Sequence, residues 1–195
     1  MAKVRMFVAI NLSSEVQDKI EETIRGIMPQ FRFPIRFLPR GNWHCTLSFL
    51  GYQPEEAVPD IEEGIRHAAE KSPISELIFE RLTYGPVDSG GKSVTPRMLW
   101  ILGTKETSEV LGRAKIMLED AFEAKGIRFE RETRLFQAHL TLARFEPQPK
   151  GQLPAIERPM RLVSRATSFD LMKSTLRRTG AEYSIYSSFD LRRTI

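Results

Sequence analysis

Two copies of a four-residue phrase hold the residues best suited to chemistry in this 195-residue chain. The phrases are His44-Cys45-Thr46-Leu47 and His139-Leu140-Thr141-Leu142, each in an apolar, β-prone segment. They contain two of the chain's three histidines, and the two histidines are 139 − 44 = 95 residues apart. Residues i and i+2 of a strand point to the same side, so each His is expected to project beside its Thr.

Paired imidazoles and hydroxyls suit acid–base chemistry on a phosphodiester. A neutral imidazole can take a proton from the attacking oxygen while a protonated one gives a proton to the leaving oxygen. The hydroxyls of Thr46 and Thr141 can donate hydrogen bonds to phosphate oxygens without adding charge. We therefore predict that His44 and His139 are catalytic and that the two threonines bind phosphate. This chemistry needs no metal, no cofactor and no covalent enzyme intermediate.

Neighbouring residues are predicted to have structural roles. Regular alternation points Cys45 and Phe49 away from His44 and leaves Ser48 on its side. We therefore expect Cys45 to be a buried hydrophobic residue rather than a nucleophile or a metal ligand. A zinc site needs three or four converging ligands, and only two imidazoles converge here. His67 lies among charged residues of a predicted helix and is expected to be solvated.

Three further residues are weaker candidates for substrate contacts. An Arg-Met pair opens each of two predicted strands, and Arg5 and Arg97 are offset by 97 − 5 = 92 residues. We predict that these arginines support the phosphate charge, with surface or structural salt bridges as an equal alternative. Phe7 lies on the same predicted strand face as Arg5 and is a candidate contact for an RNA base, although a Phe in an apolar strand more often belongs to the hydrophobic core. Arg144 lies five residues after the second motif His, so a regular strand would aim it away from the site.

The elements that position the two phrases follow a repeated order of strand, helix and His-bearing strand. Alternation with period two predicts strands, and apolar residues at i, i+4 spacing predict helices. Ser14 and Gln17 resemble a capping box at the start of the first helix. The expected elements are strands over 3–10, 35–38, 43–50, 76–84, 97–103 and from His139, and helices over 14–28, 55–71 and 107–125.

The rest of the chain completes the predicted fold. Residues 87–96 are rich in Gly, Ser and Pro and are expected to form a loop at the rim of the site. Residues 147–159 contain four prolines and are expected to form a loop or a short helix. Residues 160–195 are predicted to form two strands joined by a turn, with the first strand over residues 161–174. We predict an α+β fold of mainly antiparallel sheets with helices outside, as a single domain (1–195) of two pseudo-symmetric lobes.

Composition is typical of a folded soluble domain, with 41% hydrophobic and 28% charged residues. A net charge of +4 permits an anionic partner such as RNA without requiring one. The single cysteine excludes an internal disulfide and fits a reducing compartment. The apolar run in MAKVRMFVAINL is too short for a signal peptide, and no run reaches the roughly 20 apolar residues that a membrane span needs, so we expect neither. We therefore expect a cytoplasmic protein with no membrane contact. A closed domain of two lobes can act as a monomer, which is the oligomeric state that we expect.

The chain resembles the two-histidine phosphoesterases, and within them the RNA 2′,3′-cyclic phosphodiesterases, historically called 2′-5′ RNA ligases. The segments that carry the resemblance are RMFVAI, HCTLSFLG, RMLWIL, HLTLAR and KSTLRRTGAEYSIYSSFDL. It implies a bilobal fold with a cleft between two antiparallel sheets. It also implies hydrolysis of a terminal 2′,3′-cyclic phosphate on RNA to a 2′-phosphomonoester. The chain departs from the family pattern at Ala138, where members often have Pro before the second motif His.

The resemblance implies a role for each motif residue. His44 matches the family's proton donor to the leaving 3′-oxygen, and His139 matches the base that activates water. Thr46 and Thr141 match residues that hold phosphate oxygens. The near-symmetry of the two phrases leaves the acid and base roles open to exchange. Alternatives are action on a small cyclic nucleotide, 2′-5′ ligation as the reverse reaction, and an RNA-end-binding module without turnover.

Overall fold

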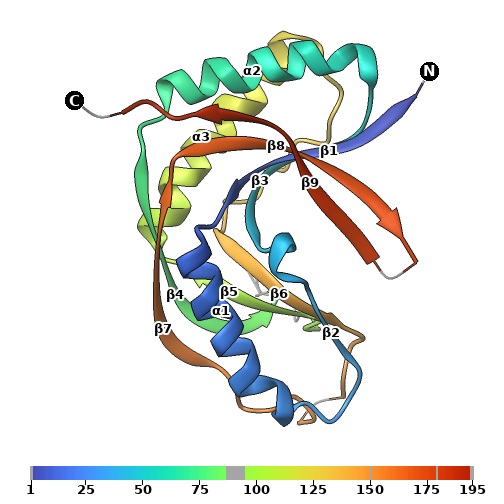
Figure 1. Ribbon diagram of the computed structural model, residues 1–195, viewed down its shortest axis with the longest axis vertical. Helices are drawn as coiled ribbons and strands as arrows, with labels where there is room; N and C mark the ends of the chain where they lie inside the picture. The colour runs from blue at the N-terminus through green and yellow to red at the C-terminus, as the bar shows by residue number, and fades with distance from the viewer. Residues whose placement is uncertain (1, 87–94, 150, 179, 194–195) are drawn as a thin grey trace.

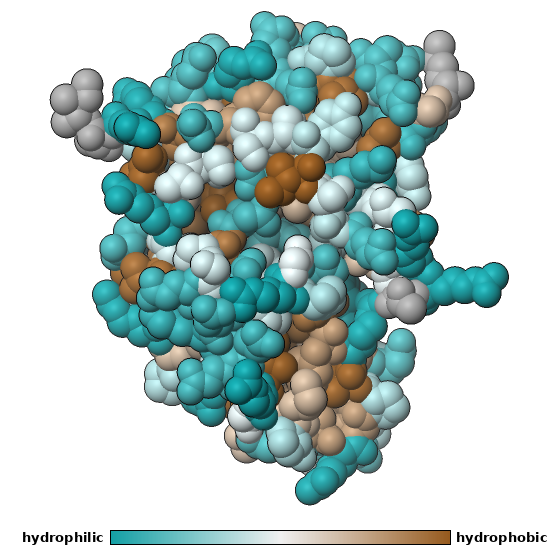
Figure 2. Space-filling model, viewed as in Figure 1, coloured by the Kyte–Doolittle hydropathy of each residue, from teal (hydrophilic) through white to brown (hydrophobic). Residues whose placement is uncertain are grey.

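The structure is a computed structural model, which describes residues 2–86, 95–149, 151–178 and 180–193. Two antiparallel sheets form its centre and three α-helices pack against them (Figure 1). The predicted α+β fold is confirmed. No helix in the described part of the chain is long and apolar enough to cross a membrane. Hydrophilic residues cover most of the face seen in Figure 2, with separate apolar patches between them.

Each sheet contains one of the two motif strands. The first sheet has the order β3-β1-β8-β9 and the second has the order β2-β6-β5-β4-β7, with every neighbouring pair antiparallel. The strands of the first sheet are β1 (Lys3–Asn11), β3 (His44–Pro54), β8 (Ser168–Arg177) and β9 (Gly180–Asp190). Those of the second are β2 (Ile35–Phe37), β4 (Ser75–Gly85), β5 (Met98–Gly103), β6 (His139–Phe145) and β7 (Arg158–Ala166).

The two halves of the chain exchange strands. Apart from β2, the sheets match in order, so that β3, β1, β8 and β9 correspond to β6, β5, β4 and β7. Strands β2 and β4 come from the first half of the chain but lie in the second sheet, while β8 and β9 come from the second half and lie in the first. The first motif therefore depends on strands from the second half of the chain, and the second motif on two strands from the first half.

This exchange corrects one prediction. Residues 161–174 were expected to form one strand, but the stretch contains the end of β7 and the start of β8, which belong to different sheets. The chain changes sheets at Thr167, whose carbonyl accepts a hydrogen bond from the Leu191 backbone at 2.8 Å. The crossing has no Gly or Pro, so the sequence pattern carries no signal that the strand ends there.

The helices begin and end close to the predicted positions. They are α1 (Ser14–Ile27), α2 (Val58–Lys71) and α3 (Lys105–Ala124). The cap of α1 is Ser13 rather than Ser14, because the extended backbone of Ser13 directs its hydroxyl to the Val16 N–H. Thr104 caps α3 by the same kind of bond, from the Thr107 N–H at 3.1 Å. Helix α1 packs against β7, α2 against β8 and β9, and α3 against β3, β4 and β5.

The main core lies between the helices and one face of each sheet. In β1 the alternation is as predicted: Met6, Val8 and Ile10 belong to this core, whereas Phe7 and Ala9 form a separate cluster on the opposite face. We call this opposite face, and the equivalent face of the second sheet, the motif faces, because they carry the His and Thr of each phrase. The described part of 147–159 contains no helix, and most of the predicted loop at 87–96 lies outside the described residues.

A buried ion pair fixes α3 to the first motif strand. The Lys115 ammonium donates to the Glu119 carboxylate at 2.7 Å, and the Ser48 hydroxyl of β3 donates to the other carboxylate oxygen at 3.0 Å. Lys115 also donates to the backbone carbonyl of Glu132 at 3.2 Å. All the polar groups of this set are therefore paired, which is the condition under which buried charges are tolerated.

Candidate active site

A β-bulge interrupts each motif strand at the same position of its phrase. The pairing of β3 with β1 skips Leu47, and the pairing of β6 with β5 skips Leu142. A bulge inserts one extra residue and shifts the side-chain alternation that follows it. The residue five positions after each motif His therefore returns to the motif face, where regular alternation would have aimed it away.

The bulges correct three predictions from regular alternation. Ser48 was expected beside His44, but it is buried on the core side, where it bonds to Glu119. Phe49 was expected on the core side, but it is 61% exposed and its ring lies 5.9 Å from that of Phe7. Arg144 was expected to point away from the site. It instead lies on the motif face, because it pairs across the sheet with Met98 of β5, which shares that face with Trp100.

The two motif strands lie next to one another although they belong to different sheets. Strand β3 is the edge of the first sheet and contacts β6 of the second. The backbone of His139 lies close enough to the buried Cys45 thiol, across this junction, to lower the pKa of the thiol against the larger effect of burial. The structure therefore brings both phrases to one place, with His44, Thr46, His139 and Thr141 all partly buried.

Aromatic rings enclose the His44 imidazole. The rings of Phe7 and Tyr183 lie 4.9 and 5.2 Å from it, and Phe7 also contacts Tyr183 edge-on at 5.1 Å. Its Nδ1 atom is buried without a hydrogen-bond partner among the described residues. This burial, with a smaller effect from the nearby His139 imidazole, lowers the pKa of His44 to about 4.

The His139 imidazole is held by a stacked ring and a backbone carbonyl. The Trp100 indole stacks on it with ring centroids 4.1 Å apart. Its Nδ1 lies 2.8 Å from the carbonyl oxygen of Gln137, which accepts only if Nδ1 carries the proton. Burial lowers the pKa of His139, and the positive charge of Arg144 lowers it further, while the Gln137 bond acts in the opposite direction. The bond leaves Nε2 as the nitrogen that can exchange a proton with a ligand.

Ala138, the residue that departs from the family pattern, makes two backbone hydrogen bonds just before His139. The backbone N–H of Ala138 donates to the Ser108 hydroxyl at 3.1 Å, and its carbonyl accepts from the Gly103 N–H at 2.8 Å. A proline has no N–H and could not make the first bond. In this chain a hydrogen bond to α3 therefore fixes the start of β6.

The other sequence candidates lie at different places around the two motif strands. Arg5 lies beside Phe7 on β1 and donates to the Ser174 hydroxyl of β8 at 2.8 Å. Phe7 is only 2% exposed, so its ring supports His44 and Phe49 and has no open face of its own. Arg97 precedes β5 and lines a pocket of about 550 Å³ at the end of β6.

The structure does not place Arg5 and Arg97 at equivalent positions of the two sheets, although their spacing in the sequence suggested a match. In the strand register Ala9 lies opposite Thr46, and Trp100 lies opposite Thr141, an offset of 100 − 9 = 91 residues rather than 92. One residue of difference moves a side chain to the other face of a strand. The two Arg-Met pairs are therefore not equivalent positions of the two sheets.

The structural roles expected for Cys45 and His67 agree with the structure. Cys45 is fully buried in the main core, and burial raises the pKa of its thiol to about 12. His67 is exposed on α2, with Nε2 2.8 Å from the Lys71 ammonium. Across the described ranges, no group of three His, Cys, Asp or Glu side chains is arranged to hold a metal ion.

Sequence reasoning missed three aromatic residues of the site, namely Trp100, Tyr183 and Phe49. Trp100 and Tyr183 contact the motif histidines, and Phe49 lies beside Phe7. The period-two pattern of the strand that contains Trp100 could have placed its side chain on the same face of the sheet as the His of a neighbouring strand. No comparable signal existed for Phe49, whose face depends on the bulge.

Comparison with known proteins identifies the family. The model of the LigT like phosphoesterase family matches residues 10–87 and 102–183, which is most of the chain. The chain belongs to the LigT like phosphoesterase family. The resemblance to two-histidine phosphoesterases predicted from the motifs is thereby confirmed.

Relatives of this LigT like phosphoesterase agree in name and in fold. The chain is 28% identical to a Thermus thermophilus protein named RNA 2′,3′-cyclic phosphodiesterase, over 97% of this chain and 91% of that protein. It is 28% identical to an Archaeoglobus fulgidus protein of the same name, over 72% of each. The crystal structure of TT0787 of Thermus thermophilus superposes with a TM-score of 0.79 at 27% identity, covering 97% of this chain and 98% of that one. That of E. coli LigT complexed with 3′-AMP gives 0.73 at 22% identity, covering 97% and 99%, and shows the shared fold.

Gly85 should be essential for the position of the Trp100 indole in this phosphoesterase. A Cβ atom at Gly85 would lie 2.3 Å from the indole Cδ2, far inside contact distance. Gly85→Ala is therefore expected to displace the indole from His139 and to lower kcat about 10-fold or more, since small misplacements at a reacting centre cost up to about 100-fold. Steady-state kinetics and tryptophan fluorescence measure both effects. Gly26→Ala on α1, where a Cβ meets nothing within 4 Å, is the matched control. An unchanged kcat in Gly85→Ala would contradict the role of the stack.

Proposed function

We propose that this protein hydrolyses the 2′,3′-cyclic phosphate at the end of an RNA strand to a 2′-phosphomonoester, without a metal ion. The observation that carries the proposal is the meeting of two imidazoles, each beside a Thr hydroxyl, at the junction of β3 and β6. The relatives named RNA 2′,3′-cyclic phosphodiesterase support the same class of substrate.

In the proposed reaction the two histidines divide the proton transfers. Nε2 of His139 takes a proton from water, whose oxygen attacks the phosphorus, because Nδ1 is committed to the Gln137 carbonyl. The bond from phosphorus to the 3′-oxygen breaks, and His44 gives that oxygen a proton. Neither motif Thr hydroxyl is hydrogen-bonded within the described residues, so both can donate to the non-bridging phosphate oxygens.

The same arrangement supports the joining of two RNA ends by a different attacking oxygen. If the 5′-hydroxyl of a second RNA strand takes the place of water, His139 accepts its proton and a 2′-5′ linkage forms as the 3′-hydroxyl leaves. The step needs no further reactant, because the cyclic phosphate supplies the bond that breaks. Joining and hydrolysis therefore differ only in the nucleophile that reaches the His139 side.

The aromatic rings of the first sheet suggest where the nucleoside lies. Attacking and leaving oxygens lie roughly in line through the phosphorus, so the ribose belongs on the His44 side, opposite the attacking oxygen. That side carries Phe7, Tyr183 and the exposed ring of Phe49. Aromatic rings stack on bases of any type, and an exposed Phe beside the site fits this role.

The lowered pKa of His44 predicts how protonation responds to ligand. A group with a pKa of about 4 is neutral at pH 7, so His44 can act as an acid only if the bound phosphate anion raises its pKa. In NMR titrations we expect a His44 midpoint near 4 in the free protein and a higher midpoint with adenosine 2′-phosphate bound. A free-protein midpoint near the ordinary value of 6.5, or no change with the ligand, would contradict this prediction.

The same shift has a consequence for stability. Because the folded-state pKa is depressed, the unfolded chain binds more protons than the folded chain between pH 6.5 and about 4. The contribution of His44 is therefore fully present above pH 6.5 and is lost as the pH falls towards 4. Thermal unfolding across this range should show a smaller fall in Tm for His44→Gln than for the wild type.

The direct test of the proposed function uses an oligonucleotide with a 2′,3′-cyclic phosphate end, incubated with the protein in EDTA. A product with a 2′-phosphate and a free 3′-hydroxyl is expected. Failure to form any product, or activity that returns only when a divalent metal is added, would overturn the proposal. Binding of the oligonucleotide with no turnover would favour an RNA-end-binding module instead.

A further inference from the structure

A second β-bulge in β3 turns the Tyr52 side chain to the motif face. The pairing of β3 with β1 skips Leu50, which is buried in the main core. Tyr52 therefore lies opposite Arg5, which is two residues from Phe7 on the same face of β1. Regular alternation after Phe49 would have aimed Tyr52 into the core. The two exposed aromatic residues of β3 instead share one face, in successive rows separated by about 7 Å.

This second bulge depends on the backbone of Gly51. Its φ is +68°, in the left-handed region that L side chains rarely adopt, and glycine is the usual residue for this conformation in a β-bulge. A Cβ atom at this position would meet nothing within 4 Å, so glycine is needed for the conformation and not for space. The sequence pair Leu50-Gly51 therefore places Tyr52 beside Phe49 on the motif face.

The Tyr52 ring is open to solvent. Its side chain is 58% exposed and has no hydrogen bond or ring contact with any residue in the described ranges. Phe49, in the row closer to the motif residues, is 61% exposed. Arg5 donates to the Ser174 hydroxyl at 2.8 Å and has no acidic partner among the residues that the structure describes. Exposed rings beside a cation are the combination with which proteins bind single-stranded nucleic acid.

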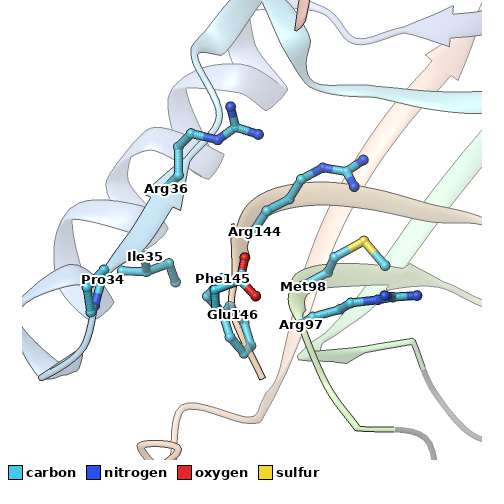
Figure 3. A pocket seen from close by; sticks show the side chains of 8 residues that line it. All are labelled: Pro34, Ile35, Arg36, Arg97, Met98, Arg144, Phe145 and Glu146. Carbon is cyan, nitrogen blue, oxygen red and sulfur yellow. The ribbon is translucent and has the colours of Figure 1, made fainter. Parts of the chain in front are cut away.

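Within the described residues, the second sheet has no counterpart of the strip formed by Phe49, Tyr52 and Arg5, which we call the aromatic strip. Arg144 occupies in β6 the position of Phe49 in β3, since each lies two residues beyond the first bulge of its strand. Figure 3 shows the Arg144 and Met98 side chains extending in the same direction at this place. Strand β6 ends one residue later, whereas β3 continues past Tyr52. The aromatic strip therefore distinguishes the His44 side of the site from the His139 side.

We infer that Tyr52 is the stacking platform for the second base from the RNA end. Its row continues the order of the proposed site, with phosphate at Thr46, the terminal base at Phe49 and the next base at Tyr52. Bases of any type stack on aromatic rings, and Arg5 offers N–H donors to the phosphodiester that joins the two nucleotides. The inference rests on the proposed function and adds a preference for RNA strands over single nucleotides. The strand upstream of the cyclic phosphate then lies along β3 and β1.

The test compares three substrates that share the same reacting end. They are adenosine 2′,3′-cyclic phosphate, an adenylate dinucleotide with that cyclic end, and the same dinucleotide without the base of its 5′ nucleotide. The readout is the ratio of kcat/KM for the complete dinucleotide to kcat/KM for the abasic one, in which effects on the reacting end and on the linking phosphate cancel. We expect a ratio of about 10 in the wild type, as for stacking of one base, and a fall of about 10-fold in Tyr52→Leu. Tyr52→Phe should keep the wild-type ratio, because the ring remains.

Two further variants test whether the effect belongs to this position. Phe49→Leu should lower kcat/KM for the mononucleotide as well as for both dinucleotides, because Phe49 is proposed to contact the terminal base. Tyr186→Leu, at a half-exposed tyrosine of β9, should leave all three values unchanged. A wild-type ratio near 1, an unchanged ratio in Tyr52→Leu, or equal losses on all three substrates in that variant would overturn the inference.

Failure of the proposed function would look different, because the wild type would then form no 2′-phosphate product from any of the three substrates. Stacking would in that case be tested by calorimetric binding of the dinucleotide with a 2′-phosphate end, with and without the base of its 5′ nucleotide. A gain in affinity from the base that is lost in Tyr52→Leu and kept in Tyr52→Phe would support the platform. No gain in the wild type, or a gain that Tyr52→Leu leaves unchanged, would overturn it.

Discussion

Replacement of His139 or His44 by alanine is expected to lower kcat by about 10²–10⁴-fold, the usual range for loss of a general acid or base. The reason is the division of labour in the proposed reaction, in which neither imidazole can do both proton transfers at once. Single-turnover hydrolysis of a cyclic-phosphate-ended oligonucleotide measures the effect without interference from product release. Activity within a few-fold of wild type in either variant would contradict the mechanism.

The design of this experiment depends on where the two histidines lie. Both are partly buried on the motif faces and neither belongs to the main hydrophobic core, so the alanine variants should remain folded. Circular dichroism and the thermal transition check this point. His67→Ala on the exposed side of α2 is the matched control and should keep full activity. The double variant should lose little more than the worse single variant, because groups that act as one unit are not additive.

Glu119→Ala is expected to lower the free energy of unfolding by about 3–5 kcal/mol, the cost of leaving a buried charge without its partner. Glu119 is 2% exposed and is the carboxylate to which both Lys115 and Ser48 donate. Its removal leaves the Lys115 ammonium buried beside an apolar methyl group. Chemical denaturation monitored by circular dichroism measures the change. A loss below about 1 kcal/mol would show that the pair is not a significant element of stability.

Two control variants distinguish the effect of the buried charge on stability from the effect of other changes in α3. Lys105 and Glu109 form an ion pair of the same i, i+4 spacing on the exposed side of α3, at 3.7 Å. Glu109→Ala should change stability by no more than about 0.5 kcal/mol, since exposed pairs contribute little. The double variant Lys115→Met with Glu119→Leu should recover most of the loss, because an apolar pair of similar volume needs no partner.

The chemical core of the site was predictable because it depends on local pattern. A His and a Thr two residues apart project together from any strand, so the four motif side chains follow from spacing alone. The repetition of the phrase then indicated that two such strands meet. The same reasoning excluded Cys45, because it occupies the intervening position. The fold class followed equally from periodicity.

What the sequence did not reveal depends on long-range pairing. Arg144 and Ser48 were assigned to the wrong faces because the bulges at Leu142 and Leu47 come from the pairing of two strands, not from either strand alone. The crossing at Thr167 was missed for a related reason. Its residues are good strand formers on both sides, and only the partners of β7 and β8 determine that they belong to different sheets.

The exchange of strands between the sheets has a consequence for a chain that is cut in two. A fragment ending after β4 would carry one motif but would lack β8 and β9, which pair beside β1. The remaining fragment would carry the other motif but lack β4, which lies between β5 and β7, and β2, which pairs with β6. Each piece would expose unpaired strand edges that fit the other piece. The protein is thus a candidate for fragment complementation, in which phosphodiesterase activity appears only when the two pieces associate.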